Sequence, residues 1–312
     1  MTGGSDPGVR GRDVASLAGV ALTGFATALL LVLLVAILGV VAVQGLPALS
    51  WRFITTIPRR DFFDAESAAV LPMIIGTTVR VLLMTVFVMP VGVITAVYLS
   101  EYARAGSRYT QAVRAAVANL AGVPSIVFGL FGLGFFINFA GRGLDRWTGA
   151  PGPVWGQPSV LWASLTLAVM TLPVVIVATE ESLRSIPAGL REASLALGAT
   201  KLQTLTGIVL PNARPGILTG GILAISRAAG EVAPILFTGA AYYLARLPGR
   251  LTDQFMDLGY HSYVLATQSP NVGQTRPILF ATVLVLLGLT FSLNALAIIV
   301  RARMRRSLRA AS

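Results

Sequence analysis

Residues 17–44 read LAGVALTGFATALLLVLLVAILGVVAVQ, a stretch without a charged side chain. A helix of about 20 apolar residues crosses the ~30 Å hydrocarbon core of a bilayer, because each residue advances the helix by about 1.5 Å. The stretch is longer than the apolar core of about 7–15 residues in a cleaved signal peptide, and no clear small-x-small cleavage site follows it. We therefore expect a retained transmembrane helix at residues 17–44.

Five further apolar runs follow, at residues 73–99, 115–140, 160–179, 216–241 and 277–300. Each run is long enough to cross a bilayer as a helix. The runs at 115–140 and 216–241 are rich in glycine, proline and small polar residues, so they need protein neighbours that shield the backbone. The sequence thus predicts an all-α, polytopic membrane protein with six transmembrane helices, preceded by a short segment (1–16) and followed by a basic tail (301–312).

The composition supports a chain whose solvent is partly lipid. The chain is 55% hydrophobic and only 12% charged, with a mean hydropathy of +0.76, whereas a soluble domain carries about 25% charged residues. The absence of cysteine excludes disulfides, zinc–thiolate sites and cysteine nucleophiles, and a single histidine makes a histidine-based metal site or catalytic triad untenable. We expect no catalytic residue, no metal site and no cofactor in this chain.

Membrane topology explains most of the net charge of +11. With the N-terminus inside, fourteen of the 24 basic residues lie on cytoplasmic segments, nine lie outside, and Arg227 falls within the fifth run. Basic residues favour the cytoplasmic side of a membrane, so we expect a multi-pass protein of the plasma or inner membrane with both termini cytoplasmic. The basic tail attracts anionic lipid headgroups, and no nucleic-acid partner is needed to explain the charge.

The longest cytoplasmic segment, residues 180–215, has the pattern of a short amphipathic helix, a turn and a second helix that ends at Pro211. Pro187 can open the first helix, Gly198 interrupts it, and Thr200 can cap the second helix. The apolar face of the first helix carries Leu190, Ala193, Ser194 and Leu197. Such a helix either lies on lipid headgroups or docks onto another protein, and the pattern alone leaves both interpretations open.

The residues of this segment match a known motif. Glu192-Ala193-Ser194, Gly198 after three residues, and Ile208-x-Leu210-Pro211 after nine more resemble the EAA motif of ABC importer permeases, with Ser194 as the one departure. The resemblance implies the type I ABC importer permease fold, in which residues 185–200 form a coupling helix that docks on a separate ATPase. The coupling residues would be Arg191, Glu192, Ala193, Ser194 and Gly198.

Three other stretches narrow the family. They read YLSEYA at 98–103, PSIVFGL at 124–130 and AISRAAGEVAP at 224–234, and together they resemble phosphate ABC transporter permeases of the PstA type over about residues 70–300. The resemblance implies a translocation path shared with a homologous second permease, an ATPase subunit dimer and an extracytoplasmic phosphate-binding protein. Helices two to six would form the core and helix one the periphery. Lys201 follows Gly-Ala-Thr rather than a GxxxxG loop, so ATP would be hydrolysed by the partner chains.

A charged pair lies inside the fifth apolar run. Arg227 is near its middle, and Glu231 follows four residues later on the same helix face, so the two side chains can pair. A central arginine costs about 2.5–3.5 kcal/mol on membrane-insertion scales, which argues against a lipid-facing position. The pair is either a structural ion pair or a charged element of the substrate path; the resemblance favours the substrate path.

Other interpretations of the chain remain open at this stage. The cargo could be another oxyanion, such as molybdate or sulfate, and a secondary transporter, a channel or a membrane-embedded enzyme are rivals of a different class. For the isolated polar residues we expect ordinary roles. Arg80 snorkels to the outer interface, His261 is a plain loop residue, and Asp253 and Asp257 are solvated loop acids.

Overall fold

The computed structural model describes residues 7–58, 63–64, 67–104, 106–149, 151–244 and 246–310. Six helices in this part of the chain are long and apolar enough to cross a membrane, as the sequence predicted. They span Ser16–Ala48, Leu71–Tyr102, Ser125–Thr148, Val160–Arg184, Lys201–Ala229 and Val272–Met304. The all-α, six-span architecture is confirmed.

Thirteen α-helices and four tighter or wider helical turns build these spans and their connections in the described residues. The α-helices are α1 (Pro7–Gly45), α2 (Trp51–Thr55), α3 (Leu71–Val97), α4 (Arg108–Ala121), α5 (Ser125–Phe131), α6 (Arg142–Thr148), α7 (Val160–Arg184), α8 (Ala188–Ala196), α9 (Lys201–Thr204), α10 (Leu210–Ala229), α11 (Ala233–Thr238), α12 (Leu258–Thr267) and α13 (Val272–Ala310). A 3₁₀ turn follows α1 (η1, Leu46–Ala48), and π-helical turns extend or join the helices at η2 (Tyr98–Tyr102), η3 (Gly132–Gly141) and η4 (Leu205–Val209).

Helix α7 lies at the centre of the bundle. Of its most apolar stretch, 67% is buried, against 28% or less in each of the other spans. It packs against α3 and α10, and its Leu167 and Met170 meet Met84 of α3 and Ala224 of α10 in the main core cluster. Its buried hydroxyl groups donate to backbone carbonyls one turn earlier, as Thr166 does to Trp162 at 2.8 Å. These bonds satisfy the polar groups inside the apolar bundle.

The third span begins later than expected. The run at 115–140 divides at Gly122–Pro124: its first residues belong to α4, whose residues are largely solvent-facing, and the span itself begins at Ser125. Pro124 lacks a backbone N–H, and the residue before a proline is driven out of the helical region. The helix therefore stops before Pro124 and starts again after it.

The fifth span begins earlier than expected. The second helix of the 180–215 segment does not end at Pro211; α9, η4 and α10 form one span from Lys201 to Ala229. The π-helical turn η4 lies directly before Leu210 and Pro211, and such wider turns let a helix continue past an irregular residue. The connection between spans four and five is thus α8 with a short link on each side.

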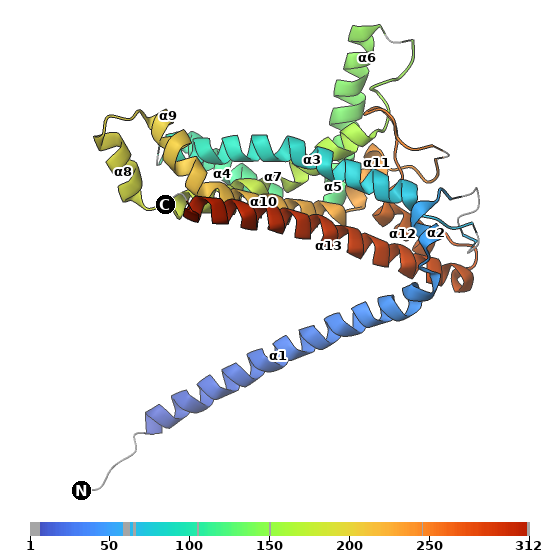
Figure 1. Cartoon of the computed structure of the whole chain (residues 1–312), viewed down its shortest axis with the longest axis horizontal. Coiled ribbons are helices and arrows are strands. Elements are labelled where there is room, and N and C mark those ends of the chain that lie inside the picture. Colours follow the sequence, from blue (N-terminus) through green and yellow to red (C-terminus); the bar gives the residue numbers. More distant parts are fainter. Residues whose placement is uncertain are drawn as a thin grey trace.

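Helix α1 leaves the bundle, as Figure 1 shows. Only 6% of its most apolar stretch is buried, and it meets α13 near its C-terminal end, where the backbone of Gly45 lies against Phe280. The expectation that helix one is peripheral is therefore confirmed. The expectation that helices two to six form the core is met only in part by the sixth: none of the most apolar stretch of α13 is buried, but Ile278 and Ala281 near its start belong to a core cluster.

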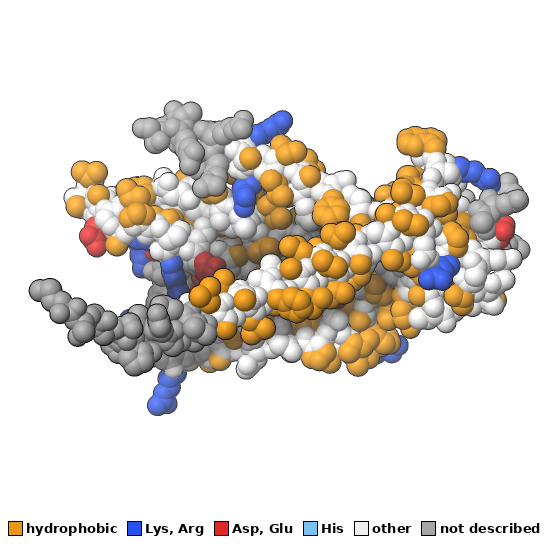
Figure 2. All heavy atoms as spheres, turned by 90° about the horizontal axis from the view of Figure 1, so that it is seen from below, with side chains coloured by type: hydrophobic (Ala, Val, Ile, Leu, Met, Phe, Trp, Pro, Cys, Tyr) orange, Lys and Arg blue, Asp and Glu red, His pale blue; other side chains and the backbone are white. Residues whose placement is uncertain are grey.

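Apolar and charged side chains occupy different parts of the surface, as expected of a membrane protein. In Figure 2, hydrophobic side chains cover the middle of the face shown, and most charged side chains lie toward its two ends. In Figure 1, helix α8, the start of α1 and the end of α13 all lie at the same end of the molecule.

Candidate functional site

The fifth span breaks close to its charged pair. Helix α10 ends at Ala229, and the short helix α11 begins at Ala233. Pro234 is the cause: in a continuous helix its ring would clash with the carbonyl of residue 230, and it has no N–H to donate. The expected unbroken helix at 216–241 is therefore wrong. The break leaves carbonyl groups of the last turn of α10 without helical partners.

Arg227 lies just before this break, and Glu231 lies within it. Arg227 lies in the last turn of α10, and its Nε is 3.7 Å from Oε1 of Glu231. The pairing predicted from their spacing is present. The side chains are 40% and 22% exposed, respectively, so the pair lies at the surface of this subunit rather than inside its core. A single long contact of this kind leaves most guanidinium donors of Arg227 available to another oxyanion.

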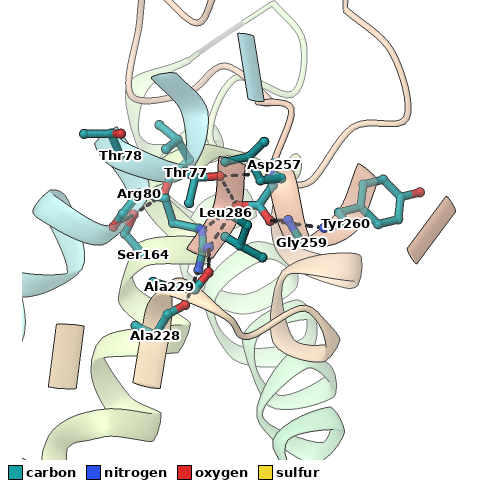
Figure 3. Close-up of polar contacts among 12 residues, drawn as sticks. Thr77, Thr78, Arg80, Ser164, Ala228, Ala229, Asp257, Gly259, Tyr260 and Leu286 are labelled. Atoms are coloured by element: carbon teal, nitrogen blue, oxygen red, sulfur yellow. Dashed lines mark hydrogen bonds and ion pairs between the residues drawn. The ribbon is translucent and has the colours of Figure 1, made fainter. Parts of the chain in front are cut away.

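Arg80 of α3 does not snorkel to the interface. Its side chain is 0% exposed, and its Nη2 lies 2.8 Å from Oδ2 of Asp257, which is also fully buried. Figure 3 shows Arg80 between Asp257 and the end of α10. There its Nη1 donates to the carbonyl of Ala228 at 2.9 Å and its Nη2 to that of Ala229 at 3.4 Å. Arg80 thus donates to both of the last two carbonyls of α10, beside the break.

Asp257 is not a solvated loop acid either. Its Oδ1 caps the start of α12 by accepting from the backbone N–H groups of Gly259 and Tyr260, at 2.9 and 3.2 Å. Its Oδ2 accepts from Thr77 at 2.9 Å, besides Arg80. A buried carboxylate is tolerable because every oxygen is paired.

A glycine brings α3 close enough for these bonds. Gly76 lies one turn before Arg80, and a Cβ atom at this position would stand 2.0 Å from the carbonyl oxygen of Met256. Only a residue without a side chain permits this approach. Gly76, Thr77 and Arg80 therefore act together to dock α3 on the segment that carries Asp257.

The coupling segment takes the form that the sequence predicted. Pro187 precedes α8, Gly198 ends it with a left-handed φ of +85°, and Thr200 starts the next helix with a capping box formed with Gln203. On the predicted apolar face, Leu190 is 45% and Leu197 90% exposed, whereas Ser194 is buried; Leu195, outside that face, is 49% exposed. Glu192 and Ala193 are also exposed on this helix. Helix α8 protrudes from the bundle, as Figure 1 shows.

Two of the five expected coupling residues face the bundle instead of solvent. Arg191 donates to the carbonyls of Leu183 and Ile186, at 2.7 and 2.8 Å, and pairs with Glu101 at 3.0 Å. Ser194 is buried and shares a hydrogen bond of 2.9 Å with Thr204. Arg191 therefore joins α8 to the end of α7 and to η2, and Ser194 joins it to α9.

The histidine is buried in a helix and does not lie in a loop. His261 belongs to α12, is 4% exposed, and lies outside the six membrane spans. Burial lowers its pKa to about 4, because desolvation disfavours the charged imidazolium. Asp253 has a local role in its loop, where Oδ2 accepts from the N–H groups of Gly249 and Arg250 at 3.0 Å each. In the part of the chain that the structure describes, no three His, Asp or Glu side chains come together as metal ligands would.

Sequence reasoning missed the roles of Arg80, Asp257 and Glu101. An ionisable residue inside a transmembrane run is a functional candidate by default, and Arg80 met that criterion. Its partner Asp257 lies 177 residues away in the sequence, so the pair exists only in the folded chain and no local pattern predicts it.

The chain matches known families and proteins. Residues 88–306 match the family model described as "Binding-protein-dependent transport system inner membrane component". The probable ABC transporter permease protein YqgI of Bacillus subtilis is 32% identical over 227 residues, which cover 73% of this chain and 71% of that protein. The phosphate transport system permease protein PstA of Xylella fastidiosa is 31% identical over 267 residues, 83% of each chain. PstA 1 of Mycobacterium tuberculosis is 42% identical over 161 residues, 52% of this chain and 47% of the relative.

A solved structure shares the fold. In the crystal structure of a bacterial alginate ABC transporter in complex with an alginate pentasaccharide-bound periplasmic protein, one chain superposes with a TM-score of 0.62 at 17% identity. The match covers 92% of this chain and 94% of that one. At this identity the likeness concerns the fold alone.

Proposed function

The chain belongs to the family of binding-protein-dependent transport system inner membrane components, the permease subunits of ABC transporters, and on that premise we propose that it is the permease of an ATP-driven importer for inorganic phosphate. It forms the translocation path together with a second, homologous permease. An ATPase subunit dimer drives it, and an extracytoplasmic phosphate-binding protein delivers the substrate. The relatives named as phosphate transport permeases support this substrate.

The Arg227–Glu231 pair at the break of the fifth span is the observation that carries the proposal. An arginine is always ionised and offers two parallel N–H groups to the oxygens of phosphate. The 3.7 Å separation and the partial exposure of both side chains leave Arg227 accessible from the subunit surface. Glu231 competes with the anion for the same guanidinium and so prevents binding that is too tight for release. The substrate therefore passes along the exposed side of α10.

Helix α8 supports the coupling to a separate ATPase. Its uncovered leucines form an apolar surface at the tip of the molecule, where an ATPase can dock. Glu192, Ala193 and Gly198 belong to this exposed part, whereas Arg191 and Ser194 connect it to the bundle. A channel or secondary transporter would have no use for this arrangement. The start of α1 and the end of α13 lie on the same side as α8 (Figure 1), which supports a cytoplasmic position for both termini.

Uptake by the complete reconstituted complex tests the substrate. The complex of both permeases and the ATPase dimer is placed in proteoliposomes with its binding protein and ATP. We expect radiolabelled phosphate to accumulate, and excess unlabelled phosphate to suppress that accumulation while equal concentrations of sulfate or molybdate leave it unchanged. ATP-dependent accumulation of sulfate or molybdate, but not of phosphate, would keep the permease role and refute the phosphate assignment.

A further inference from the structure

One carbonyl oxygen connects the buried pair Arg80–Asp257 with the exposed pair Arg227–Glu231. The carbonyl of Ala228 accepts from Nη1 of Arg80 at 2.9 Å and from the backbone N–H of Glu231 at 3.2 Å. Ala228 directly follows Arg227 in the chain. The guanidinium of Arg80 thus holds the backbone from which Arg227 projects and to which Glu231 is bonded.

The end of α10 needs such a partner. Pro234 releases the carbonyls of the last helical turn, and Ala228 and Ala229 are buried, at 0% and 1% exposure. Carbonyls buried in an apolar bundle without a donor are costly, and the C-terminal end of a helix carries partial negative charge that repels an anion. Arg80 supplies a further donor to the carbonyl of Ala228, a donor to that of Ala229, and a compensating positive charge. Asp257 balances Arg80 and receives its Nε at 3.0 Å.

We propose that Arg80 and Asp257 are the positioning residues of the Arg227–Glu231 site. They hold the end of α10 in its broken geometry, so that Arg227 and Glu231 stand on the exposed side while Arg80 occupies the buried side of the same turn. This inference rests on the proposed transport function. It assigns a role to a charge pair that stability alone does not require, because apolar residues of similar volume often replace buried ion pairs without loss of stability.

Three variants test the proposal in the reconstituted complex: Arg80→Gln, Asp257→Asn and Arg80→Lys. The measurements are the yield of assembled complex, phosphate uptake per assembled complex, and the ratio of uptake to ATP hydrolysis. We expect Arg80→Gln and Asp257→Asn to lower uptake per complex about tenfold while ATP hydrolysis continues, since misplacing a binding group by about 1 Å has effects of this size or larger. Arg80→Lys keeps the charge and one donor, so it should retain an intermediate uptake.

Ser226→Ala is the matched control. Ser226 lies in the same last turn of α10 and donates to Asn294 of α13 at 2.8 Å, but it touches neither released carbonyl. Ser226→Ala removes this one interhelical hydrogen bond of α10, and phosphate uptake per assembled complex should stay at the wild-type level.

Each outcome decides for or against the positioning role. Wild-type uptake per complex in Arg80→Gln overturns it, whatever the yield. If Arg80→Gln does not assemble, Arg80→Lys decides: reduced uptake per complex supports the role, and wild-type uptake refutes it. Loss of assembly in both variants also refutes it, because the pair would then serve folding alone. Failure of the wild-type complex to take up phosphate, or normal uptake by Arg227→Gln, would instead refute the proposed function itself.

Discussion

At the scale of single residues, the arginines of this permease differ in what surrounds them. Arg80 has its charge balanced and its donors used by Asp257 and two carbonyls, all inside the protein. Arg227 has one long contact and a side chain that is 40% exposed. A guanidinium whose N–H donors are all paired stabilises the structure, whereas one with unpaired donors can exchange partners. This contrast is why we assign binding to Arg227 and positioning to Arg80.

Substitutions at Arg227 should distinguish geometry from charge. Arg227→Lys keeps the positive charge but loses the two-pronged donor, and a hydrogen bond to a charged group is worth about 1.5–3 kcal/mol, so phosphate uptake should fall about tenfold or more. Arg227→Gln should abolish uptake. Both variants should still insert and assemble, because a partly exposed ion pair contributes little to stability. Uptake is measured per assembled complex.

The double variant Arg227→Gln with Glu231→Gln completes the cycle. Glu231→Gln alone should also impair transport, since Arg227 loses its competitor and retains phosphate too long. If the pair were only structural, the double variant would recover both complex yield and uptake, because no charge would be left unpaired. Normal yield with no uptake is the result we expect.

The single histidine gives the protein a predictable acid sensitivity. The pKa of His261 is lowered to about 4 in the folded state, against about 6.5 in an unfolded chain. The unfolded state therefore binds more protons, and the stability of the folded state is lost as the pH falls from about 6.5 toward 4. The effect should reach about 2 kcal/mol at pH 5. Thermal unfolding in detergent should show a lower melting temperature at pH 5 than at pH 7.5.

His261→Gln provides the comparison for this effect. The variant has no imidazole to protonate, so its melting temperature should fall less between the two pH values than that of the wild type. An equal fall in both proteins would mean that other groups cause the acid sensitivity.

At the scale of helices, hydropathy predicted how many spans exist but not where they break. The runs at 115–140 and 216–241 contained Pro124 and Pro234, and each proline ends a helix that the apolar pattern continues. Side-chain hydropathy does not register a lost backbone donor. The coupling segment was predicted more closely, because Pro187, Gly198 and Thr200 act on the local backbone alone. The inward direction of Arg191 was not predictable, since its partner Glu101 lies at the end of another span.

Changes on α8 should break the coupling between the permease and its ATPase, so that substrate no longer stimulates ATP hydrolysis. Glu192→Lys reverses a charge on the exposed surface of α8, and Gly198→Asp places a side chain at a left-handed φ of +85°, which L-residues adopt at a cost of about 1–2 kcal/mol. Both variants should reach the membrane and assemble. We expect phosphate uptake and substrate-stimulated ATPase activity to fall together, by about tenfold, in the reconstituted complex.

Gln111→Lys on α4 is the control for the added charge. Gln111 is exposed on a short polar helix, as Glu192 is, but lies outside the coupling segment. It should behave as the wild type. Normal stimulation and transport in both α8 variants would show that this segment does not transmit the work of the ATPase.

At the scale of the whole molecule, the subunit leaves the apolar surfaces of two spans largely uncovered by its own fold. Helix α1 stands away from the bundle, and the most apolar stretch of α13 has no buried residue. In our proposal, lipid and the second permease cover these surfaces of α1 and α13. Composition predicted this membrane setting, but not which helices would be left uncovered, because that depends on how α3, α7 and α10 pack.

Reporter fusions test the orientation of the assembled chain. We expect the site after Arg306 to lie in the cytoplasm and the site beside Asp253 to lie outside it. Six spans and the distribution of basic residues place these two sites on opposite sides of the membrane. A cytosolic reporter such as green fluorescent protein and a secreted one such as alkaline phosphatase give opposite signals at each site. The same side for both sites would mean that a predicted span does not cross.

The unbroken span from Lys201 to Ala229 has a mechanical consequence. With its far end pinned by Arg80, it is a lever whose fulcrum lies at Ala228 and whose long arm, from Lys201 to Arg227, measures about 40 Å at 1.5 Å per residue. A shift of roughly 5 Å at the arm's free end, beside α8, turns the lever by only about 7° on that arm length. Arg227 lies next to the fulcrum, so the direction of its side chain changes while its position hardly does. Under the proposed coupling to an ATPase, a coarse stroke beside α8 would become a fine change in the direction of one guanidinium.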